Sequence, residues 1–458
     1  MATRKTTVTP SKPPSSSRRL AVEILNCIDE QQGYAEPLLN AYLSTYEQKD
    51  QRDKNLLTQI VFGTLRMRGY LDWAIGHYYR GSFDKMDTAV KNILRTALFQ
   101  IFFLDRLPPY AVVNEAVELI PPKQKQKALV NGLLRNVLRT KEQIPWPDRT
   151  NDPSLYISVL HSHPLWLVEK WTALFGEEET RQRCASHNIV PPAAIRVNAR
   201  KTSRQEMMAE MKQAGWNIEG SAYAPDSIHI LHAETPVKNT TWFREGKIQF
   251  QDDGSQLVAH FLQPRPGEKI LDLCAGTGGK ATHMAALMDD KGCILAVDNR
   301  QKKLDSLQEM ARRLDVTCIK TLCRDGKTNL PCQPGSFDAV LVDAPCTGLG
   351  TLRRNPEIKW RLDPAEIPAI VALQRDLLEN AAACLRKGGR LVYSTCTVLP
   401  EENDDQVASF LARHREFRQE KYIPHIPASC LDEKGAMKTV PHRHNMDAFF
   451  AACLTKID

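Results

Sequence analysis

Hydrophobic residues recur at helical spacing through the first third of the chain. In RRLAVEILNCIDE (18–30) they fall at Leu20, Val22, Ile24 and Leu25, and the spacing continues through KNLLTQIVFGTLRMRGYLDWAI (54–75). NEAVELI (114–120) and KALVNGLLRNVLR (127–139) add two more helical stretches. Amphipathic helices place their apolar residues on one face in this way. We therefore predict an all-helical domain over residues 18–143.

The pattern changes after this domain. IPWPDRTNDP (144–153) is rich in Pro and Asp, which is typical of a linker. Residues 154–190 again show helical spacing. AAIRVNAR (193–200) then favours a strand, and SRQEMMAEMKQAGW (203–216) favours an amphipathic helix. We predict a linker and helical region over 144–190, and a small α+β subdomain over 191–253.

Short apolar segments alternate with helical stretches in the last part of the chain, 254–458. The predicted strands are KILDL (269–273), CILAVD (293–298), VTCIK (316–320), FDAVLVD (337–343) and GRLVYST (389–395). This alternation indicates a doubly wound, Rossmann-like α/β domain with a mainly parallel sheet. MDAFFAACL (446–454) could add a late strand.

Composition narrows the setting without deciding the function. The chain of 458 residues carries a net charge of +7 and twelve cysteines. No two cysteines are spaced as CxxC, so a reducing, cytoplasmic setting is favoured over a disulfide-rich secreted one. No apolar run approaches the roughly 20 residues of a membrane span. Residues 1–17 are basic and rich in Ser, Thr and Pro, which predicts a disordered lead-in. We expect a monomer.

A glycine-rich turn, Gly276-x-Gly278-Gly279, follows the first predicted strand and opens a helix. Its spacing differs from the dinucleotide pattern GxGxxG. Asp298 ends the second strand, where a carboxylate can accept hydrogen bonds from ribose hydroxyls. Carboxylates disfavour phosphate, so adenosine with a zwitterionic tail, S-adenosylmethionine, fits better. Asp325 follows the third strand, where it would face the adenine or merely form an Asp-Gly turn.

Two cysteines follow predicted strands in similar contexts, Cys346 in LVDAPCTGLG (341–350) and Cys396 in LVYSTCTVLP (391–400). Ligands of open α/β sheets bind at the carboxyl ends of the strands, so both thiols should face the donor. Inert burial suits Cys293, Cys318 and Cys384 better. No His or Cys lies nearby at metal spacing, so we expect no metal. HSH (161–163) and HRH (442–444) are interpreted as surface histidines.

A thiol beside a methyl donor suggests one specific chemistry. C5 of a pyrimidine is too poor a nucleophile to take a methyl group directly. A thiolate that adds to C6 makes C5 carbanion-like, and loss of the C5 proton followed by thiol elimination completes the cycle. Asp343 could hold the cytosine edge at N3/N4, and Lys280 supplies positive charge within reach. A free thiol has a pKa of ~8.5, so the site must stabilise the thiolate.

These motifs resemble the RNA cytosine-C5 methyltransferases, the NOL1/NOP2/Sun group. The resemblance rests on DAPC (343–346) and STC (394–396), with RVN (196–198), FQDDGSQLVA (250–259), RRNPEIKW (353–360) and PEEND (400–404) as further landmarks. The helical domain resembles the NusB RNA-binding fold through RRLAVEIL, VFGTLR, ILRTALFQIFFLDRLPPYAVVNEAVEL and VNGLLRNVLR. The combination implies a class I methyltransferase domain, RNA binding by the helical domain and the small subdomain, and a 16S ribosomal RNA substrate.

The resemblance also implies roles for single residues. Cys396 would be the nucleophile and Cys346 would assist product release, whereas DNA cytosine-C5 methyltransferases attack with the other cysteine, so sequence alone leaves the roles open. The implied donor contacts are Cys274, Ala275, Gly276, Thr277, Gly278, Gly279, Lys280, Asp298, Asp325 and Asp343. Many members read AAPGGK where this chain reads AGTGGK (275–280), so Thr277 replaces Pro.

Three alternatives stay open. The chain could methylate cytosine in transfer RNA or DNA by the same chemistry, or act as a non-catalytic RNA-binding assembly factor. A dinucleotide-dependent oxidoreductase is disfavoured by the loop spacing. Phosphate contacts from the helical domain could come from a basic face, although a solvated face explains each residue alone. That face would comprise Arg18, Arg19, Lys123, Lys125, Lys127, Arg135 and Arg139.

Overall fold

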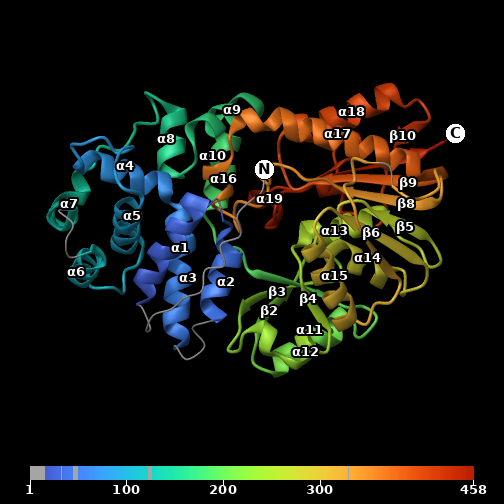
Figure 1. Cartoon of the computed structure of the whole chain (residues 1–458), viewed down its shortest axis with the longest axis horizontal. Helices are drawn as coiled ribbons and strands as arrows, with labels where there is room; N and C mark the ends of the chain where they lie inside the picture. Colours follow the sequence, from blue (N-terminus) through green and yellow to red (C-terminus); the bar gives the residue numbers. More distant parts are fainter. Residues whose placement is uncertain (1–15, 32, 45–49, 122–125, 329, 458) are drawn as a thin grey trace. The chain divides into compact units, whose positions relative to one another are not determined.

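The computed structural model describes residues 16–31, 33–44, 50–121, 126–328 and 330–457 (Figure 1). Packing divides the chain into two units. The first comprises Met1–Ile189 and Arg353–Arg361, and the second comprises Val190–Leu352 and Leu362–Asp458. In the part of the chain described, no helix has the length and apolar character that crossing a membrane requires.

The first unit is helical, as predicted. Its helices are α1 (Ser17–Gln31), α2 (Ala35–Ser44), α3 (Gln51–Arg66), α4 (Arg68–Tyr78), α5 (Thr88–Phe103), α6 (Pro109–Leu119), α7 (Gln126–Thr140), α8 (Pro153–Leu160), α9 (Leu165–Phe175), α10 (Glu177–His187) and α16 (Ile358–Arg361). Asp87 caps α5 by accepting from the amides of Ala89 and Val90, which satisfies two otherwise unpaired donors. Val90 and residues 92–100 of α5 are buried, so this helix forms the centre of the unit.

A short segment far along the chain, Arg353–Arg361, completes the first unit. Lys359 Nζ donates to the Arg66 carbonyl (3.0 Å), and Trp360 Nε1 donates to the Leu65 carbonyl (2.7 Å). Both carbonyls belong to the last turn of α3, where no further helical amide can reach them. Although this segment falls within residues 254–458, it therefore packs with the helices.

The second unit begins with an antiparallel sheet in the order β2-β3-β1-β4. Its strands are β1 (Ala193–Val197), β2 (Asn217–Gly220), β3 (Ser227–His232) and β4 (Ile248–Phe250), with helices α11 (Arg204–Gln213) and α12 (Thr241–Arg244). Ser203 and Glu206 form a capping box that starts α11. The predicted small α+β subdomain is thus present.

The larger sheet has the order β10-β12-β9-β8-β5-β6-β7, with β11 paired to β12. Its strands are β5 (Lys269–Asp272), β6 (Cys293–Asp298), β7 (Ile319–Cys323), β8 (Phe337–Asp343), β9 (Leu385–Thr395), β10 (Phe417–Gln419), β11 (Met437–Lys438) and β12 (Phe450–Lys456). Strands β5 to β9 are parallel, whereas β12 pairs antiparallel with β9. The doubly wound α/β prediction is confirmed, with an antiparallel edge.

Helices cover both faces of this sheet (Figure 1). The helices are α13 (Asp253–Leu262), α14 (Gly279–Leu287), α15 (Gln301–Arg313), α17 (Ile367–Cys384), α18 (Asp404–Arg413) and α19 (Pro441–His444). One apolar core packs α13, α14 and α15 on one face, and a second packs α17 and α18 on the other. Strands β5, β6 and β8 and the second half of β9 are largely buried, which explains their continuous apolar sequences, whereas β7 at the edge is only partly buried.

The third strand was predicted three residues too early. VTCIK (316–320) was expected, but β7 begins at Ile319. The Asp290 carboxylate accepts hydrogen bonds from the amides of Thr317 and Cys318, each 3.0 Å long. These amides are therefore occupied by a side chain before the strand ladder begins. The short strands β10 and β11 were not predicted, while the late strand is β12.

Candidate active site

The two cysteines of the repeated motif lie side by side beyond two neighbouring strands. β8 and β9 run parallel, with Asp343 opposite Ser394 in the ladder. Cys346 follows β8, Cys396 follows β9, and their Sγ atoms are 3.4 Å apart. The structure thus brings together two thiols that lie fifty residues apart in the sequence.

The environment of Cys346 favours its protonated form. A hydrogen bond between the thiols of Cys346 and Cys396 and burial together raise the pKa of Cys346 well above the ordinary value. The charges of Cys396 and Glu402 act in the same direction. Cys346 is therefore held as a thiol whose S–H can donate toward Cys396 Sγ.

An ion pair lies at the same edge of the sheet. Lys280 Nζ is 2.7 Å from Asp343 Oδ2, and Ser394 Oγ donates to Asp343 Oδ1 at 2.9 Å. Burial lowers the pKa of Lys280, but the charge and hydrogen bond of Asp343, with the charges of Cys396 and Asp272, raise it overall. Lys280 therefore keeps its positive charge at neutral pH, electrostatically coupled to Cys396.

A buried carboxylate positions the loop that carries Cys346. Glu402 accepts from the Thr347 amide (2.9 Å), the Thr347 hydroxyl (2.6 Å) and Gln374 Nε2 (2.9 Å). The same Gln374 nitrogen donates to the Pro345 carbonyl at 2.9 Å. These contacts hold both neighbours of Cys346. We did not assign Glu402 to the site from the sequence, although PEEND (400–404) contained the signal.

The next residue of that motif supports the Cys396 loop. Asn403 Oδ1 accepts from the Thr395 hydroxyl (2.5 Å), and Asn403 Nδ2 donates to the Thr397 carbonyl (3.1 Å). Thr395 and Thr397 flank Cys396 in the chain. Glu402 and Asn403 are neighbours in the chain, and each holds one cysteine loop. Together they therefore fix the two loops relative to each other.

The glycine-rich turn has the backbone geometry of a ligand loop. Gly276 and Gly278 adopt positive φ angles of 57° and 91°. A Cβ on Gly278 would lie 2.4 Å from Leu307 Cγ, whereas one on Gly276 would meet no atom within 4 Å. The loop therefore needs glycine at Gly278 for packing, and it leaves open space beside Gly276.

The carboxylate of Asp298, at the end of β6, links this turn to the neighbouring strand. Asp298 Oδ2 accepts from the Gly276 amide (3.1 Å), and Asp298 Oδ1 accepts from the Arg300 amide (2.9 Å). Lys303 Nζ lies 3.6 Å from the same carboxylate. Asp298 thus shapes the loop through these hydrogen bonds, and it stands at the strand end where ribose contact was predicted.

The remaining predicted donor contacts differ in their surroundings. Thr277 is exposed at the tip of the turn, Ala275 is buried, and Cys274 packs against the apolar core. Burial raises the pKa of Cys274 well above its ordinary value. Asp325 is half-buried and accepts from the Lys327 amide at 3.0 Å, so it forms the turn that was the alternative interpretation.

A buried carboxyl beneath the loop was not among the predicted site residues. Asp272 ends β5 and is 1% exposed. Burial, followed by the charge of Asp343, raises the pKa of Asp272 to about 7, although Lys280 opposes the shift. A carboxyl that titrates near neutrality at a ligand-binding edge is a recognised mark of a functional site.

The subdomain supports the same loop from outside the larger sheet. Arg196 of β1 donates to the Gly279 carbonyl (2.7 Å) and to the Thr282 hydroxyl (3.1 Å). Asn198 donates to the Gly246 and Leu314 carbonyls, at 3.1 and 3.0 Å. The RVN motif (196–198) therefore connects the subdomain to α14 and α15.

Two of the histidines interpreted as surface residues are buried. His163 is 1% exposed and His444 is 7% exposed. His163 Nε2 lies 3.2 Å from His187 Nδ1, and His444 Nδ1 accepts from the Val440 amide at 2.9 Å. The surface interpretation was wrong for both, because each ring packs against a segment that is more distant in sequence: His163 contacts His187, and His444 Nε2 lies 3.1 Å from the Ser429 carbonyl.

The predicted basic face of the helical unit is smaller than expected. Arg18 is largely buried and forms an ion pair with Glu115 at 2.7 Å, so it is occupied within the fold. Arg19 is exposed and Lys127 is half-buried, while Lys123 and Lys125 lie outside the described residues. Arg135 and Arg139 are exposed, one turn apart on α7.

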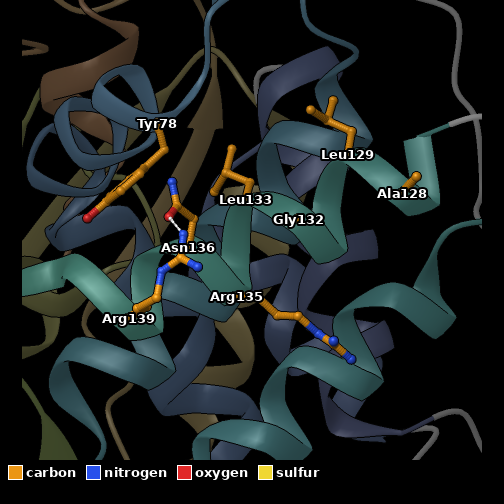
Figure 2. Close-up of a pocket in the computed structure, with 8 residues that line it drawn as sticks. All are labelled: Tyr78, Ala128, Leu129, Gly132, Leu133, Arg135, Asn136 and Arg139. Atoms are coloured by element: carbon orange, nitrogen blue, oxygen red, sulfur yellow. Dashed lines mark hydrogen bonds between the residues drawn. The ribbon is translucent and has the colours of Figure 1, made fainter.

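Those two arginines line a groove of about 480 Å³, shown in Figure 2. Tyr78 of α4 forms its other wall, and Arg139 donates to Asn136 Oδ1 at 2.8 Å. The remaining lining comes from α7, with Ala128, Leu129, Gly132 and Leu133. The groove thus combines an aromatic ring with two cations.

Comparison with known proteins decides the family. A Bacillus subtilis protein, "Probable ribosomal RNA small subunit methyltransferase B", is 33% identical over 449 residues, which cover 96% of this chain and 99% of that one. The ribosomal RNA small subunit methyltransferase B of Escherichia coli is 31% identical, covering 96% and 98%. The family model "16S rRNA methyltransferase RsmB/F" matches residues 259–455. The chain belongs to the RsmB/F family.

Matches to the other parts agree with this RsmB/F assignment. The NusB family model matches residues 15–139, and the ferredoxin-like domain of RsmF/B methyltransferases matches residues 163–238. The crystal structure of PH0851 is similar with a TM-score of 0.80 and 27% identity, covering 97% of this chain and all of that one. The chain is therefore an S-adenosylmethionine-dependent ribosomal RNA methyltransferase with a NusB-type helical domain.

Proposed function

We propose that this RsmB/F-family protein methylates C5 of a cytosine in 16S ribosomal RNA through a covalent adduct between Cys396 and C6. The observation that carries the proposal is the pair of thiols 3.4 Å apart, beside the Lys280–Asp343 ion pair. A single thiol suffices to attack, so a second thiol beside the same ion pair calls for a second role.

The first step is attack on the base. Cys346 holds its proton strongly, and the Lys280 charge interacts favourably with a Cys396 thiolate, so Cys396 is the better nucleophile. Its sulfur forms a bond to C6, and the electron pair of the C5–C6 double bond moves toward C5 and the ring. In this proposal Asp343 accepts a hydrogen bond from the N4 amino group of the cytosine.

The co-substrate S-adenosylmethionine supplies an electrophilic methyl group, and the residues around its site fit such a ligand. Open space beside Gly276, the Asp298 carboxylate and the buried Asp272 carboxyl suit a ribose and a cationic tail better than a phosphate. When C5 takes the methyl group, the donor leaves as a neutral thioether.

The last step removes the C5 proton and breaks the C6–S bond. Once Cys396 is bound to carbon, it is neutral and no longer hydrogen-bonds as a thiolate, so the largest influence that raises the pKa of Cys346 disappears together with the charge of Cys396, while burial and Glu402 remain. Cys346 can then release its proton to solvent and take the proton from C5, while Cys396 leaves as a thiolate. One proton is released per methyl group, and the initial state is restored.

The test uses purified protein, labelled methyl donor and a 16S transcript. Cys396→Ala should lose both methylation and adduct, while Cys346→Ala should accumulate a covalent RNA adduct on denaturing gels. An adduct in Cys396→Ala would reverse the roles. Preferential labelling of transfer RNA in competition would change the substrate, and no transfer from the wild type to any RNA would favour the assembly-factor alternative.

For the helical unit, we propose that the groove of Figure 2 contacts RNA phosphates through Arg135 and Arg139. Neither has a carboxylate partner among the ion pairs of the described residues. Arg135→Gln should weaken RNA binding and reduce the salt dependence of log K by about one contact. An unchanged salt slope would assign the groove another role.

A further inference from the structure

Three metal-ligating side chains converge at a place that the methyl-transfer site does not use. Asp226 precedes β3 in the small subdomain, His260 lies in α13, and His283 lies in α14. His260 Nε2 is 2.8 Å and His283 Nε2 is 3.1 Å from the same atom, Asp226 Oδ2. All three ligand atoms lie within 4.8 Å of one another.

This donor set suits a first-row divalent metal. Zinc binds imidazole nitrogen and carboxylate oxygen at 2.0–2.2 Å, and tetrahedral ligand atoms are then about 3.3 Å apart. The nitrogen–oxygen separations at Asp226 are a few tenths of an ångström shorter than that. Small rotations of the two rings, which stand at 86° to each other, would therefore admit an ion.

The cluster is enclosed on one side and accessible on the other. The side chain of His283 is 2% exposed, while those of His260 and Asp226 are 12% and 20% exposed. An ion could thus enter past Asp226 and keep one water as a fourth ligand. Arg196 is nearby but donates to the Gly279 carbonyl and the Thr282 hydroxyl, so its hydrogen bonds are directed elsewhere.

We propose that Asp226, His260 and His283 bind one Zn²⁺ ion that fastens the small subdomain to α13 and α14. The N-terminus of α14 is the glycine-rich loop, so the ion would also steady the donor site. The competing explanation is a metal-free clip in which both histidines donate to Asp226. The inference does not depend on the proposed methylation chemistry.

The test uses the full-length protein after treatment with a chelator. Titration with Co²⁺ should show one ion per chain, with visible absorption of a four-coordinate site and no thiolate charge-transfer band. Zn²⁺ should displace Co²⁺ and raise the thermal midpoint, because a ligand that binds only the folded state stabilises it.

His260→Gln is the informative variant, because a glutamine amide can still donate to Asp226 but is a poor zinc ligand. It should keep the metal-free midpoint within a few degrees and lose at least tenfold in Co²⁺ affinity, while the exposed control His232→Gln should bind as the wild type does. Absence of stoichiometric binding, equal binding by His260→Gln, or a thiolate charge-transfer band would overturn the proposal.

Discussion

Strands β8 and β9 carry a pair of cysteines at each end, and we propose a catalytic role for only one pair. Cys332 and Cys384 precede the two strands with their sulfurs 3.6 Å apart, while Cys346 and Cys396 follow the strands at 3.4 Å. The separations are nearly equal. Closeness of two thiols therefore does not distinguish a reactive pair from an inert one.

The surroundings of the two pairs differ. Cys332 and Cys384 pack against an apolar core, and burial, followed by the charge of Cys332, raises the pKa of Cys384 to about 12. The Cys346–Cys396 pair has Lys280 beside it and Glu402 behind it. The two cysteine pairs therefore differ in the positive charge and the hydrogen-bonded loop beside the Cys346–Cys396 pair, and not in the distance between their sulfurs.

The largest difference is expected when one cysteine of each pair is replaced by alanine in turn. Cys396→Ala should lower methyl transfer by at least about 10³-fold, because the covalent route is lost. Cys384→Ala should leave the rate within about twofold and cost on the order of 1 kcal/mol of stability. Rates and thermal midpoints measured together check both, and comparable rate losses would remove the distinction between the pairs.

The second effect concerns Lys280, whose positive charge lies beside the Cys346–Cys396 pair. Lys280→Met should reduce the rate about 10- to 1,000-fold at neutral pH, since a neighbouring opposite charge shifts the ionisation of a group by about 1–3 pKa units. The loss should shrink at higher pH, where hydroxide can generate the thiolate without that charge. A pH–rate profile tests this prediction, with the exposed Lys291→Met as the control. A loss equal at all pH values would assign Lys280 to donor binding.

The third effect tests the support behind Cys346. Glu402→Gln replaces one of two accepting oxygens with a donor that faces the Thr347 amide or hydroxyl. We expect about 1–3 kcal/mol of lost stability and a roughly tenfold slower release of the adduct. Single-turnover kinetics separates release from attack, and exposed Asp405→Asn is the matched control. An unchanged thermal midpoint would show that Glu402 does not hold the loop.

The candidate site at the carboxyl ends of β8 and β9 could be predicted because its sequence signals are local. A strand followed by Pro and Cys, or by Thr and Cys, can be recognised within ten residues, and so can the glycine-rich turn. The 3.4 Å gap could not be predicted, because it depends on β8 and β9 being neighbours in a sheet.

The errors have the same physical origin. Arg18 was placed on a basic face, but its partner Glu115 lies 97 residues away. The start of β7 moved because Asp290, from an earlier turn, binds the amides of Thr317 and Cys318. Hydrogen-bond partners that are distant in sequence leave no periodic pattern in the chain.

The smallest expected effect comes from a pair of carboxylates on β8 itself. Asp338 near its start and Asp343 at its end each form a 2.7 Å ion pair, with Arg386 and Lys280. The arginine side chain of the first pair is 49% exposed, whereas the lysine of the second is 12% exposed. Solvent screens the first pair, so Asp338→Asn should cost about 0.5 kcal/mol and leave methyl transfer unchanged.

The pH dependence of this small effect has a definite sign. Burial raises the pKa of Asp338, but the Lys269 amide and Arg386 lower it overall. A carboxylate whose folded-state pKa is depressed stabilises the fold above its unfolded pKa, and that contribution disappears as the pH falls through the folded value. The difference between wild type and Asp338→Asn in urea unfolding should therefore be largest at neutral pH and shrink below about pH 4. A difference that grows in acid would mean that Asp338 is held protonated, which its contacts with Lys269 and Arg386 oppose.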